Sequence, residues 1–224
     1  ILIVWKNITG RAIREQQRIA MTNAVAHNLK TPLCVINGFS ENLREESGYL
    51  TKQHYINVIQ EQANEMDILV HKMLNFSKLE SDSAKLNIKS FNIKTELENI
   101  ANKYNNISSK NIIVTADDKE IFADKELMEL LFENLIENAV KYSKDNSDIK
   151  ISFANNNFNI SNECDEISKK DLKKIWKPYN RLEKDEEVRG TGIGLSIVKH
   201  ILKLHRIKPY TEYSGGRLII GFYI

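Results

Sequence analysis

Cysteine is scarce in this 224-residue sequence, and neither sign of charge dominates it. Its two cysteines, Cys34 and Cys164, lie far apart and form no CxxC pair. A disulfide framework or a zinc site is therefore not expected, and a reducing cytoplasm fits. The sequence holds 32 basic and 30 acidic residues and no arginine-rich stripe interleaved with aromatic residues. Nucleic acid is therefore not an expected partner.

A long apolar run is also missing. The sequence begins with ILIVW and then turns basic, whereas a helix needs about 20 apolar residues to cross a membrane. Two interpretations stay open for this end. It is either the cytoplasmic edge of a span outside the sequence, where Trp and basic residues gather, or a buried or fraying end. The first makes residues 1–16 a linker in a protein attached to the membrane through an N-terminal region absent from this chain.

The composition is otherwise that of a folded protein, with 42% hydrophobic and 28% charged residues. A packed core is therefore expected. The length allows one large or two small domains.

Helix-breaking residues are rare in the first part of the chain. From about residue 9 to residue 79, past Gly10, little interrupts a helical pattern except Pro32, Gly38 and Gly48, and a turn is expected at residues 47–49. Two such helices with narrow apolar stripes make a poor core alone. Pairing with a second copy in a dimeric four-helix bundle is expected, so the protein is predicted to be a homodimer. The stripes comprise Val25, Leu29, Ile36 and Leu43, then Ile56, Ile59, Ala63, Met66, Val70 and Met73.

The character of the sequence changes near Ser83. Short β-rich stretches then alternate with helical ones in irregular order, which predicts an α+β sandwich with helices on one face of a sheet. The expected domains are residues 17–82 and 83–224, and residues 155–157 are expected to turn a hairpin. The predicted strands lie at 112–115, 149–153, 158–160 and 218–223, and the predicted helices at 95–104, 125–142 and 193–204.

One histidine stands out, within the segment AHNLKTPL at residues 26–33. His27 projects away from the apolar stripe, and an exposed imidazole on a helix is a nucleophile that is neutral near pH 7. Thr31 lies one turn further along the same face, and Pro32 is expected to bend the helix there. A lone histidine of this kind is more often an ordinary surface residue, and the other four histidines are interpreted that way.

A second motif, NLIENAVKY, occupies residues 134–142. Asn134 and Asn138 are four residues apart, so both amides leave one helix face, which Lys141 joins. Two amide oxygens and an ammonium group suit Mg²⁺ and a polyphosphate. Alone, the motif is more simply a solvated polar face.

A third motif, GTGIGLSIV, occupies residues 190–198. Closely spaced glycines at the start of a helix let backbone N–H groups reach phosphate oxygens. The spacing matches neither a Walker A loop nor a dinucleotide fingerprint. The charged stretch at residues 181–189 suits a mobile lid over a nucleotide. An ordinary helix start is the alternative.

In this order and spacing, the three motifs resemble the transmitter region of bacterial two-component sensor histidine kinases. HNLKTPL resembles the phosphoacceptor H box, NLIENAVKYS the N box, GTGIGLSIV the G2 box and IWKPYNR (residues 175–181) the F box. Asp124, ahead of the N box, also fits. The resemblance covers the chain from about residue 20 to its end. It implies a dimeric helical hairpin followed by an ATP-binding domain of the gyrase, chaperone and kinase superfamily.

The resemblance also implies an activity and the residues that carry it. His27 would be phosphorylated from Mg²⁺–ATP and would pass the phosphoryl group to an aspartate of a cognate response regulator. Thr31 would position water for a phosphatase activity, and Asn134 and Asn138 would bind Mg²⁺. The implied nucleotide-binding residues are Asn134, Asn138, Lys141, Tyr142, Asn162, Arg181, Gly190, Thr191, Gly192, Gly194 and Leu195.

Two stretches depart from the family pattern. Asn28 follows the histidine where most relatives carry Glu or Asp, and an amide can orient the imidazole but cannot take its proton. In the G1 box, Asn162 replaces the aspartate that binds adenine, and Cys164 and Glu166 replace glycines. The oxygen of Asn162 can accept the same hydrogen bond from adenine, without charge assistance.

These departures keep other functions open. One is a degenerate kinase that acts as a nucleotide-binding dimeric scaffold or phosphatase. Another is a different ATPase or a serine kinase of the same superfamily, against which an H box on a bundle helix argues.

Overall fold

The computed structural model describes residues 26, 28–44, 52–80, 86–178 and 192–224. The chain divides into two compact units, Ile1–Leu74 and Asn75–Ile224, and each is described by itself. The predicted turn at residues 47–49 and the predicted domain boundary near Ser83 lie outside the described residues. No helix among the described residues is both long enough and apolar enough to cross a membrane.

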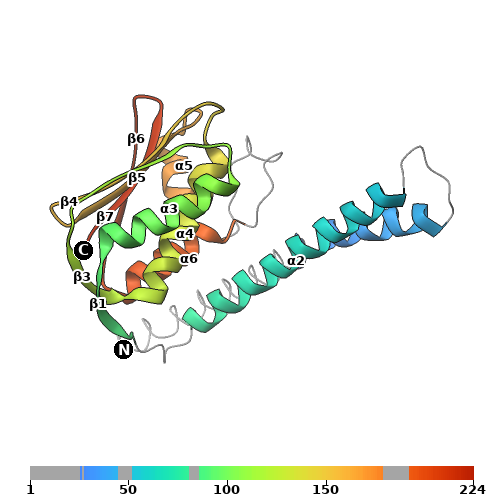
Figure 1. Ribbon diagram of the computed structural model, residues 1–224, viewed down its shortest axis with the longest axis horizontal. Coiled ribbons are helices and arrows are strands. Elements are labelled where there is room, and N and C mark those ends of the chain that lie inside the picture. Colours follow the sequence, from blue (N-terminus) through green and yellow to red (C-terminus); the bar gives the residue numbers. More distant parts are fainter. Residues whose placement is uncertain (1–25, 27, 45–51, 81–85, 179–191) are drawn as a thin grey trace, which may run out of the picture. The chain divides into compact units, whose positions relative to one another are not determined.

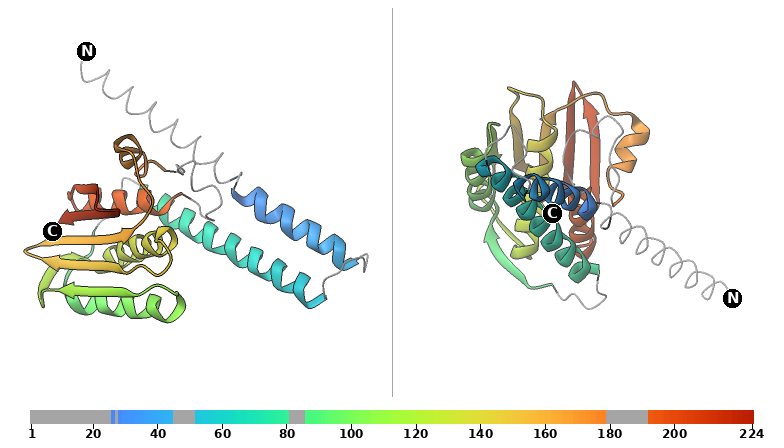
Figure 2. Two further views of the ribbon diagram at one scale, coloured as in Figure 1. Left: turned by 90° about the horizontal axis from the view of Figure 1, so that it is seen from above. Right: turned by 90° about the vertical axis from the view of Figure 1, so that its right-hand side faces the viewer.

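The first unit is helical, as predicted. Residues 28–44 form one helix, and α2 (Lys52–Glu80) lies beside it (Figures 1 and 2). The rings of Phe39 and Tyr55 join the two helices, with centroids 5.7 Å apart. Pro32 is buried and does not end its helix.

Many apolar side chains of this unit are exposed within the single chain. Val70 and Met73 belong to the predicted stripe, and Val70 is 41% exposed. Large apolar side chains on a monomer are normally scattered rather than gathered on one pair of helices. Among the described residues of this unit, the exposed ones are Leu33, Ile56, Ile68, Val70 and Leu74.

The second unit is built on a five-stranded sheet with the order β2-β4-β5-β7-β6. The pair β2–β4 is parallel and the other pairs are antiparallel. β1 and β3 form a separate antiparallel ribbon. The strands are β1 (Ile88–Asn92), β2 (Ile112–Ala116), β3 (Glu120–Asp124), β4 (Ile149–Ala154), β5 (Asn157–Glu163), β6 (Pro209–Ser214) and β7 (Arg217–Tyr223).

Three helices cover one face of this sheet, namely α3 (Ile93–Ile107), α4 (Lys125–Tyr142) and α6 (Gly194–Leu204) (Figures 1 and 2). A short helix, α5 (Lys169–Lys174), precedes α6. The α+β sandwich with helices on one face is therefore confirmed.

The core lies between the sheet and these helices. Alternate strand residues point toward it, as the period of two requires, and β5 and β7 show strict alternation over most of their length. The ring of Phe158 stacks on Phe222, with centroids 4.8 Å apart, and meets Phe132 of α4 at 5.0 Å. This contact fixes α4 against the centre of the sheet.

Side-chain caps determine where the central helices begin. Asn92 accepts a hydrogen bond from the Thr95 N–H group at the start of α3 (2.9 Å). Asp124 accepts one from the Leu127 N–H group at the start of α4 (3.2 Å). Such caps satisfy N–H groups that the helix leaves open. The bounds of α4 agree with the predicted helix at 125–142.

Candidate active site

Asn134 carries an unusual polar atom. The residue is 3% exposed, and its Nδ2 donates to the Leu130 carbonyl of the preceding turn (2.7 Å). Its Oδ1 is buried and has no hydrogen-bond partner among the described residues. Buried polar atoms are nearly always paired in native proteins, and an exception calls for an explanation such as an absent ion or water. An amide oxygen is a suitable ligand for a hard cation such as Mg²⁺.

The glycine-rich segment lies against this oxygen. A Cβ atom built on Gly194 would come within 3.1 Å of Asn134 Oδ1, so the absence of a side chain lets the start of α6 approach α4. Gly192 has φ = 66°, a conformation that favours glycine. Ile193, at the N-cap, makes no side-chain cap bond. The Ser196 N–H group donates to the Ile193 carbonyl (3.0 Å), and the start of α6 is a helix N-terminus, the kind of place where backbone N–H groups and the helix dipole favour an anion.

Two of the sequence motifs thus meet in the part of the chain that the structure describes. The N box and the start of the G2 box, two segments about 60 residues apart, come together at Asn134 and Gly194. Leu195 is buried beside them. Gly190, Thr191 and Arg181 lie outside the described residues. These surroundings fit a magnesium nucleotide by the chemistry of the oxygen donors and by the close approach at Gly194.

The rest of the polar face of α4 is half-buried. Asn138, Lys141 and Tyr142 are all partly accessible. Lys141 Nζ lies 5.5 Å from the centroid of the Tyr142 ring, a distance at which a cation and an aromatic face attract. Lys141 therefore remains beside the last turn of α4 while keeping contact with solvent.

Asn162 lies on β5, with its side chain on the helix-covered side of the sheet. It is 3% exposed, and its Nδ2 lies 3.5 Å from the Glu163 carbonyl, which is a long hydrogen bond. The same carbonyl accepts a hydrogen bond from the Lys144 N–H group at 2.9 Å. The predicted adenine-facing residue is therefore joined to the segment that follows α4.

The departures in the G1 box have a structural explanation. Cys164 and Glu166 are not among the described residues with positive φ, so the backbone does not require glycine at either position. Cys164 is buried, and its N–H group donates to the Gly216 carbonyl (3.2 Å). A side chain replaces the expected glycine without strain.

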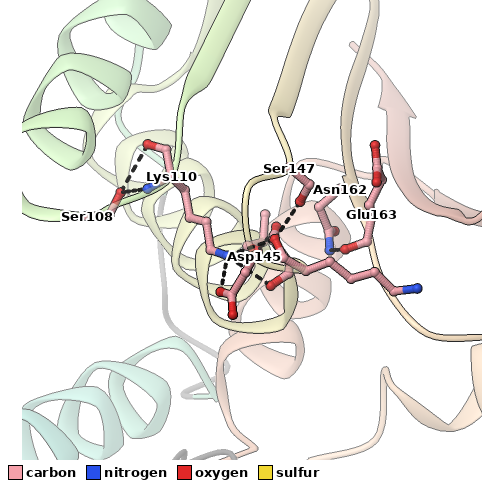
Figure 3. Close-up of polar contacts among 9 residues, drawn as sticks. Ser108, Lys110, Asp145, Ser147, Asn162 and Glu163 are labelled. Atoms are coloured by element: carbon pink, nitrogen blue, oxygen red, sulfur yellow. Dashed lines mark hydrogen bonds and ion pairs between the residues drawn. The ribbon is translucent and has the colours of Figure 1, made fainter.

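A lysine that the sequence motifs do not include lies close to this region. Lys110 comes from the loop before β2, and its Nζ donates to the carbonyls of Ser143 (3.2 Å) and Lys144 (2.8 Å) just past α4 (Figure 3). It also pairs with Asp145 at 3.0 Å. No sequence signal distinguishes it from a solvated loop lysine, because its partners lie more than 30 residues away.

Asp124 and His205 hold the ends of two site helices together. The Asp124 N–H group donates to His205 Nε2 (3.1 Å), and His205 Nδ1 lies 2.9 Å from the Ile201 carbonyl. His205 therefore carries its proton on Nδ1 and joins the end of α6 to the start of α4. The sequence interpretation of His205 as an ordinary surface histidine missed this role.

Tyr104 buttresses the outer side of α4. Its hydroxyl donates to Glu137 Oε1 at 3.1 Å. Burial, with the negative charges of Glu137 and Glu133 adding to it, raises the pKa of Tyr104 far above the ordinary value. The phenol therefore stays protonated and remains a donor to the N-box glutamate.

The H-box residues belong to the other unit. Asn28 is half-buried and Thr31 is exposed, both on the helix formed by residues 28–44. His27 lies outside the described residues. Thr31 is therefore reachable by a partner, as predicted for a surface residue of this helix.

A hollow of about 470 Å³ on the sheet unit does not coincide with these motifs. It lies on the open face of the sheet and is lined by residues such as Ile113, Lys150 and Tyr210. None of the predicted nucleotide-binding residues lines it. The motif geometry, rather than the size of the hollow, identifies the candidate site.

Comparison with known proteins identifies the families that the two parts of the chain match. Residues 17–82 match the family described as "His Kinase A (phospho-acceptor) domain". Residues 123–220 match the family described as "Histidine kinase-, DNA gyrase B-, and HSP90-like ATPase". The sensor protein kinase WalK of Staphylococcus aureus is 27% identical over 96% of this chain and 55% of its own length.

Solved histidine kinase structures share the fold. AdeS of Acinetobacter baumannii has a TM-score of 0.72 at 20% identity, covering 88% of this chain and 96% of that chain. ThkA in complex with the response regulator protein TrrA has a TM-score of 0.71 at 22% identity, covering 94% and 63%. ShkA in complex with AMPPNP has a TM-score of 0.63 at 13% identity, covering 89% and 44%.

The chain therefore belongs to the histidine kinases, of which it carries the phospho-acceptor and ATP-binding domains. It spans about half or less of the length of the curated relatives that it matches.

Proposed function

We propose that this chain is the transmitter of a two-component sensor kinase, which phosphorylates His27 from Mg²⁺–ATP and passes the phosphoryl group to an aspartate of a response regulator. The observation that carries the proposal is the unpartnered, buried Oδ1 of Asn134 beside Gly194. A buried acceptor with no partner costs stability. Its retention is accounted for if a cation or its water shell completes the site.

The proposed nucleotide contacts follow from the chemistry of each side chain. Asn134 and Asn138 offer amide oxygens to Mg²⁺, and Lys141 and Arg181 offer positive charge to the phosphates. Asn162 and Tyr142 would contact the base. The backbone at the start of α6 would bind phosphate oxygens, through Gly190, Thr191, Gly192, Gly194 and Leu195.

Phosphoryl transfer depends more on the alignment of the histidine with the γ-phosphate than on covalent catalysis by other side chains. A ring nitrogen of His27 forms a bond to the γ-phosphorus while the bond from that phosphorus to the bridging oxygen breaks. ADP leaves with the electron pair. The ring proton passes to water or to a phosphate oxygen, because the Asn28 amide is not a base at neutral pH. Asn28 would then orient the imidazole, and Thr31 would position water for dephosphorylation of the regulator.

A homodimer is proposed from the exposed apolar residues of the helical unit. Ile56, Ile68 and Leu74 are each more than a third exposed in the single chain, and a second hairpin would cover them in a four-helix bundle. We also propose a cognate response regulator as partner, which the complex of ThkA with the response regulator protein TrrA supports by analogy. Attachment to a membrane would come from a region outside this chain, and this part would then face the cytoplasm.

A labelling experiment tests the proposal. The full chain is incubated with γ-labelled ATP and Mg²⁺, and acid-labile, base-stable label is expected on the protein. His27→Gln should abolish the label. His71→Gln is the matched control, because His71 is an exposed histidine of the same unit, and it should label normally. Equal labelling of His27→Gln and the unmutated chain would refute the assignment.

A second candidate function, the degenerate kinase, is favoured by Asn28 and by Asn162, which both replace acidic residues of the family pattern. On this proposal the chain binds ATP and forms no phosphohistidine, and it acts as a scaffold or phosphatase. Asn28→Glu distinguishes the two. A marked gain in labelling identifies a base as the missing element of a kinase, whereas ATP binding without label in both proteins supports the scaffold.

A further inference from the structure

The Lys110 side chain is only 9% exposed, whereas the side chains of four other ion-paired lysines of the ATP-binding unit are 39–60% exposed. It lies between α3 and β2, outside every motif that the nucleotide site uses. Its Nζ donates to three oxygens, the carbonyls of Ser143 and Lys144 and the carboxylate of Asp145 (Figure 3). A lysine that is this buried requires its contacts, because an ammonium group is costly to desolvate.

The two carbonyl contacts matter more than the ion pair. The end of a helix leaves carbonyls without partners and carries partial negative charge, so a cation there is stabilising. Asp145 is fully exposed, and an ion pair with an exposed carboxylate contributes little. Lys110 therefore acts as a cap, supplied from another part of the chain, for the segment that leaves α4.

The capped segment is joined directly to the strand that carries Asn162. The Lys144 carbonyl accepts hydrogen bonds from Lys110 Nζ and from Ser147 Oγ (2.7 Å). The Lys144 N–H group donates a hydrogen bond to the Glu163 carbonyl (2.9 Å). That carbonyl also accepts from Asn162 Nδ2. One chain of contacts thus runs from Lys110 through Lys144 to the residue proposed to face adenine.

The far end of the same segment is held separately. Arg217 donates to the Asp148 carbonyl (2.8 Å) and to Glu163 Oε1 (2.9 Å). Loss of the Lys110 contacts would therefore loosen the segment next to α4 while Arg217 still holds its connection to β4.

We propose that Lys110 is a positioning residue for base recognition, which fixes the end of the N-box helix relative to Asn162. The inference rests on the proposed function, because it assumes that adenine occupies the space between Tyr142 and Asn162. Lys110 touches no reacting atom. Its effect is on the discrimination between nucleotides, through the separation of the two elements that flank the base.

The experiment measures two dissociation constants of the full chain, and the quantity compared is the Kd for GTP divided by the Kd for ATP. A high ratio means that the chain prefers ATP. Lys110→Met, which keeps the length of the side chain but removes its donors, should lower this ratio by about three- to tenfold. Lys110→Arg, whose guanidinium can reach both carbonyls, should stay within about twofold of the unmutated ratio. Asp145→Asn is the matched control, since it removes only the ion pair, and it should leave the ratio unchanged.

Two further measurements separate positioning from general stability. In the Asn162→Ala background, Lys110→Met should cause no further fall in the ratio, because the positioned group is already absent. Without nucleotide, hydrogen exchange of the Lys144 amide should be faster in Lys110→Met and unchanged in Asp145→Asn. If Lys110→Met does not fold, Lys110→Gln, which keeps one amide donor, should give a smaller fall in the ratio.

The outcomes distinguish the two proposals. No ATP binding by the unmutated chain would refute the proposed function, and the role of Lys110 would fall with it. Normal ATP preference in the unmutated chain, together with an unchanged ratio in folded Lys110→Met, would refute the positioning role alone. An equal further loss in the Asn162→Ala background would also refute it, because the effect would then not pass through Asn162.

Discussion

Replacement of Asp124 by alanine should destabilise the ATP-binding unit by about 2 kcal/mol. Loss of the cap on the Leu127 N–H group costs about 1 kcal/mol. Asp124 Oδ2 also accepts from the Asn87 N–H group at 2.8 Å. Asn87 is exposed, so water replaces that acceptor and the loss is only about 0.5–1.5 kcal/mol. Asp124→Asn keeps a capping oxygen but loses the charge near the helix start, so it should cost about 1 kcal/mol.

Urea unfolding of the full chain checks these values. The sequence has two tryptophans, Trp5 and Trp176. Trp176 is buried, and its Nε1 donates to Thr211 Oγ1 (2.8 Å). In a Trp5→Phe background its fluorescence reports on this unit alone. A loss of 2 kcal/mol lowers the midpoint by about 1 M urea.

A control and a refuting result complete this test. Asp118→Ala removes an exposed carboxylate that accepts from Asn92 Nδ2, and it should change stability by less than about 0.5 kcal/mol. If Asp124→Ala moves the midpoint no more than Asp118→Ala does, the capping argument is wrong. Equal losses for Asp124→Asn and Asp124→Ala would show that charge, and not the hydrogen bond, is decisive.

Three other predictions concern Gly194, Asp171 and Tyr104. Gly194→Ala should weaken ATP binding about tenfold, because its Cβ would crowd the amide oxygen beside it, whereas Gly38→Ala, where nothing lies within 4 Å, should leave the affinity unchanged in the same titration. The hydrogen bond from the Ser168 hydroxyl, and then Lys174, lower the pKa of Asp171 below its ordinary 3.8. The ionised Asp171 carboxylate therefore stabilises the folded state above about pH 4, and this stabilisation is lost as the pH falls through the lowered pKa. A carboxyl NMR titration should show that low midpoint and its return toward 3.8 in Ser168→Ala; an unmoved midpoint would contradict the cause. The raised pKa of Tyr104 means that Tyr104→Phe should leave the absorbance titration near pH 10 unchanged, and loss of one tyrosine step there would contradict its burial.

The sequence allowed the central elements to be predicted because local signals agree there. The helix at Lys125–Tyr142 has an acidic cap before it and an apolar face along it, and its bounds were predicted correctly. The strands β4, β5 and β7 were recognised from their β-rich composition. The hairpin at residues 155–157 was also predicted, and Asn155 and Asn156 both have positive φ.

Other elements could not be predicted, because their stability depends on distant partners. β1 and β3 are five residues each and pair with one another across a helix. β6 begins at Pro209, which is typical of an edge strand and weakens the strand signal. At the site, the motifs located Asn134 and Gly194, but the contacts of Lys110 and His205 span more than 30 residues and leave no local pattern.

The buried, unpartnered acceptor on Asn134 has a consequence for attempts to engineer this protein. The fold already shields that oxygen from bulk solvent, so it is positioned as a ligand before a cation binds. A leucine of similar size at position 134 would relieve that penalty and raise the melting temperature. Selection for thermal stability alone should therefore enrich apolar residues at position 134. The most thermostable variants from such a selection would be those that no longer bind the nucleotide.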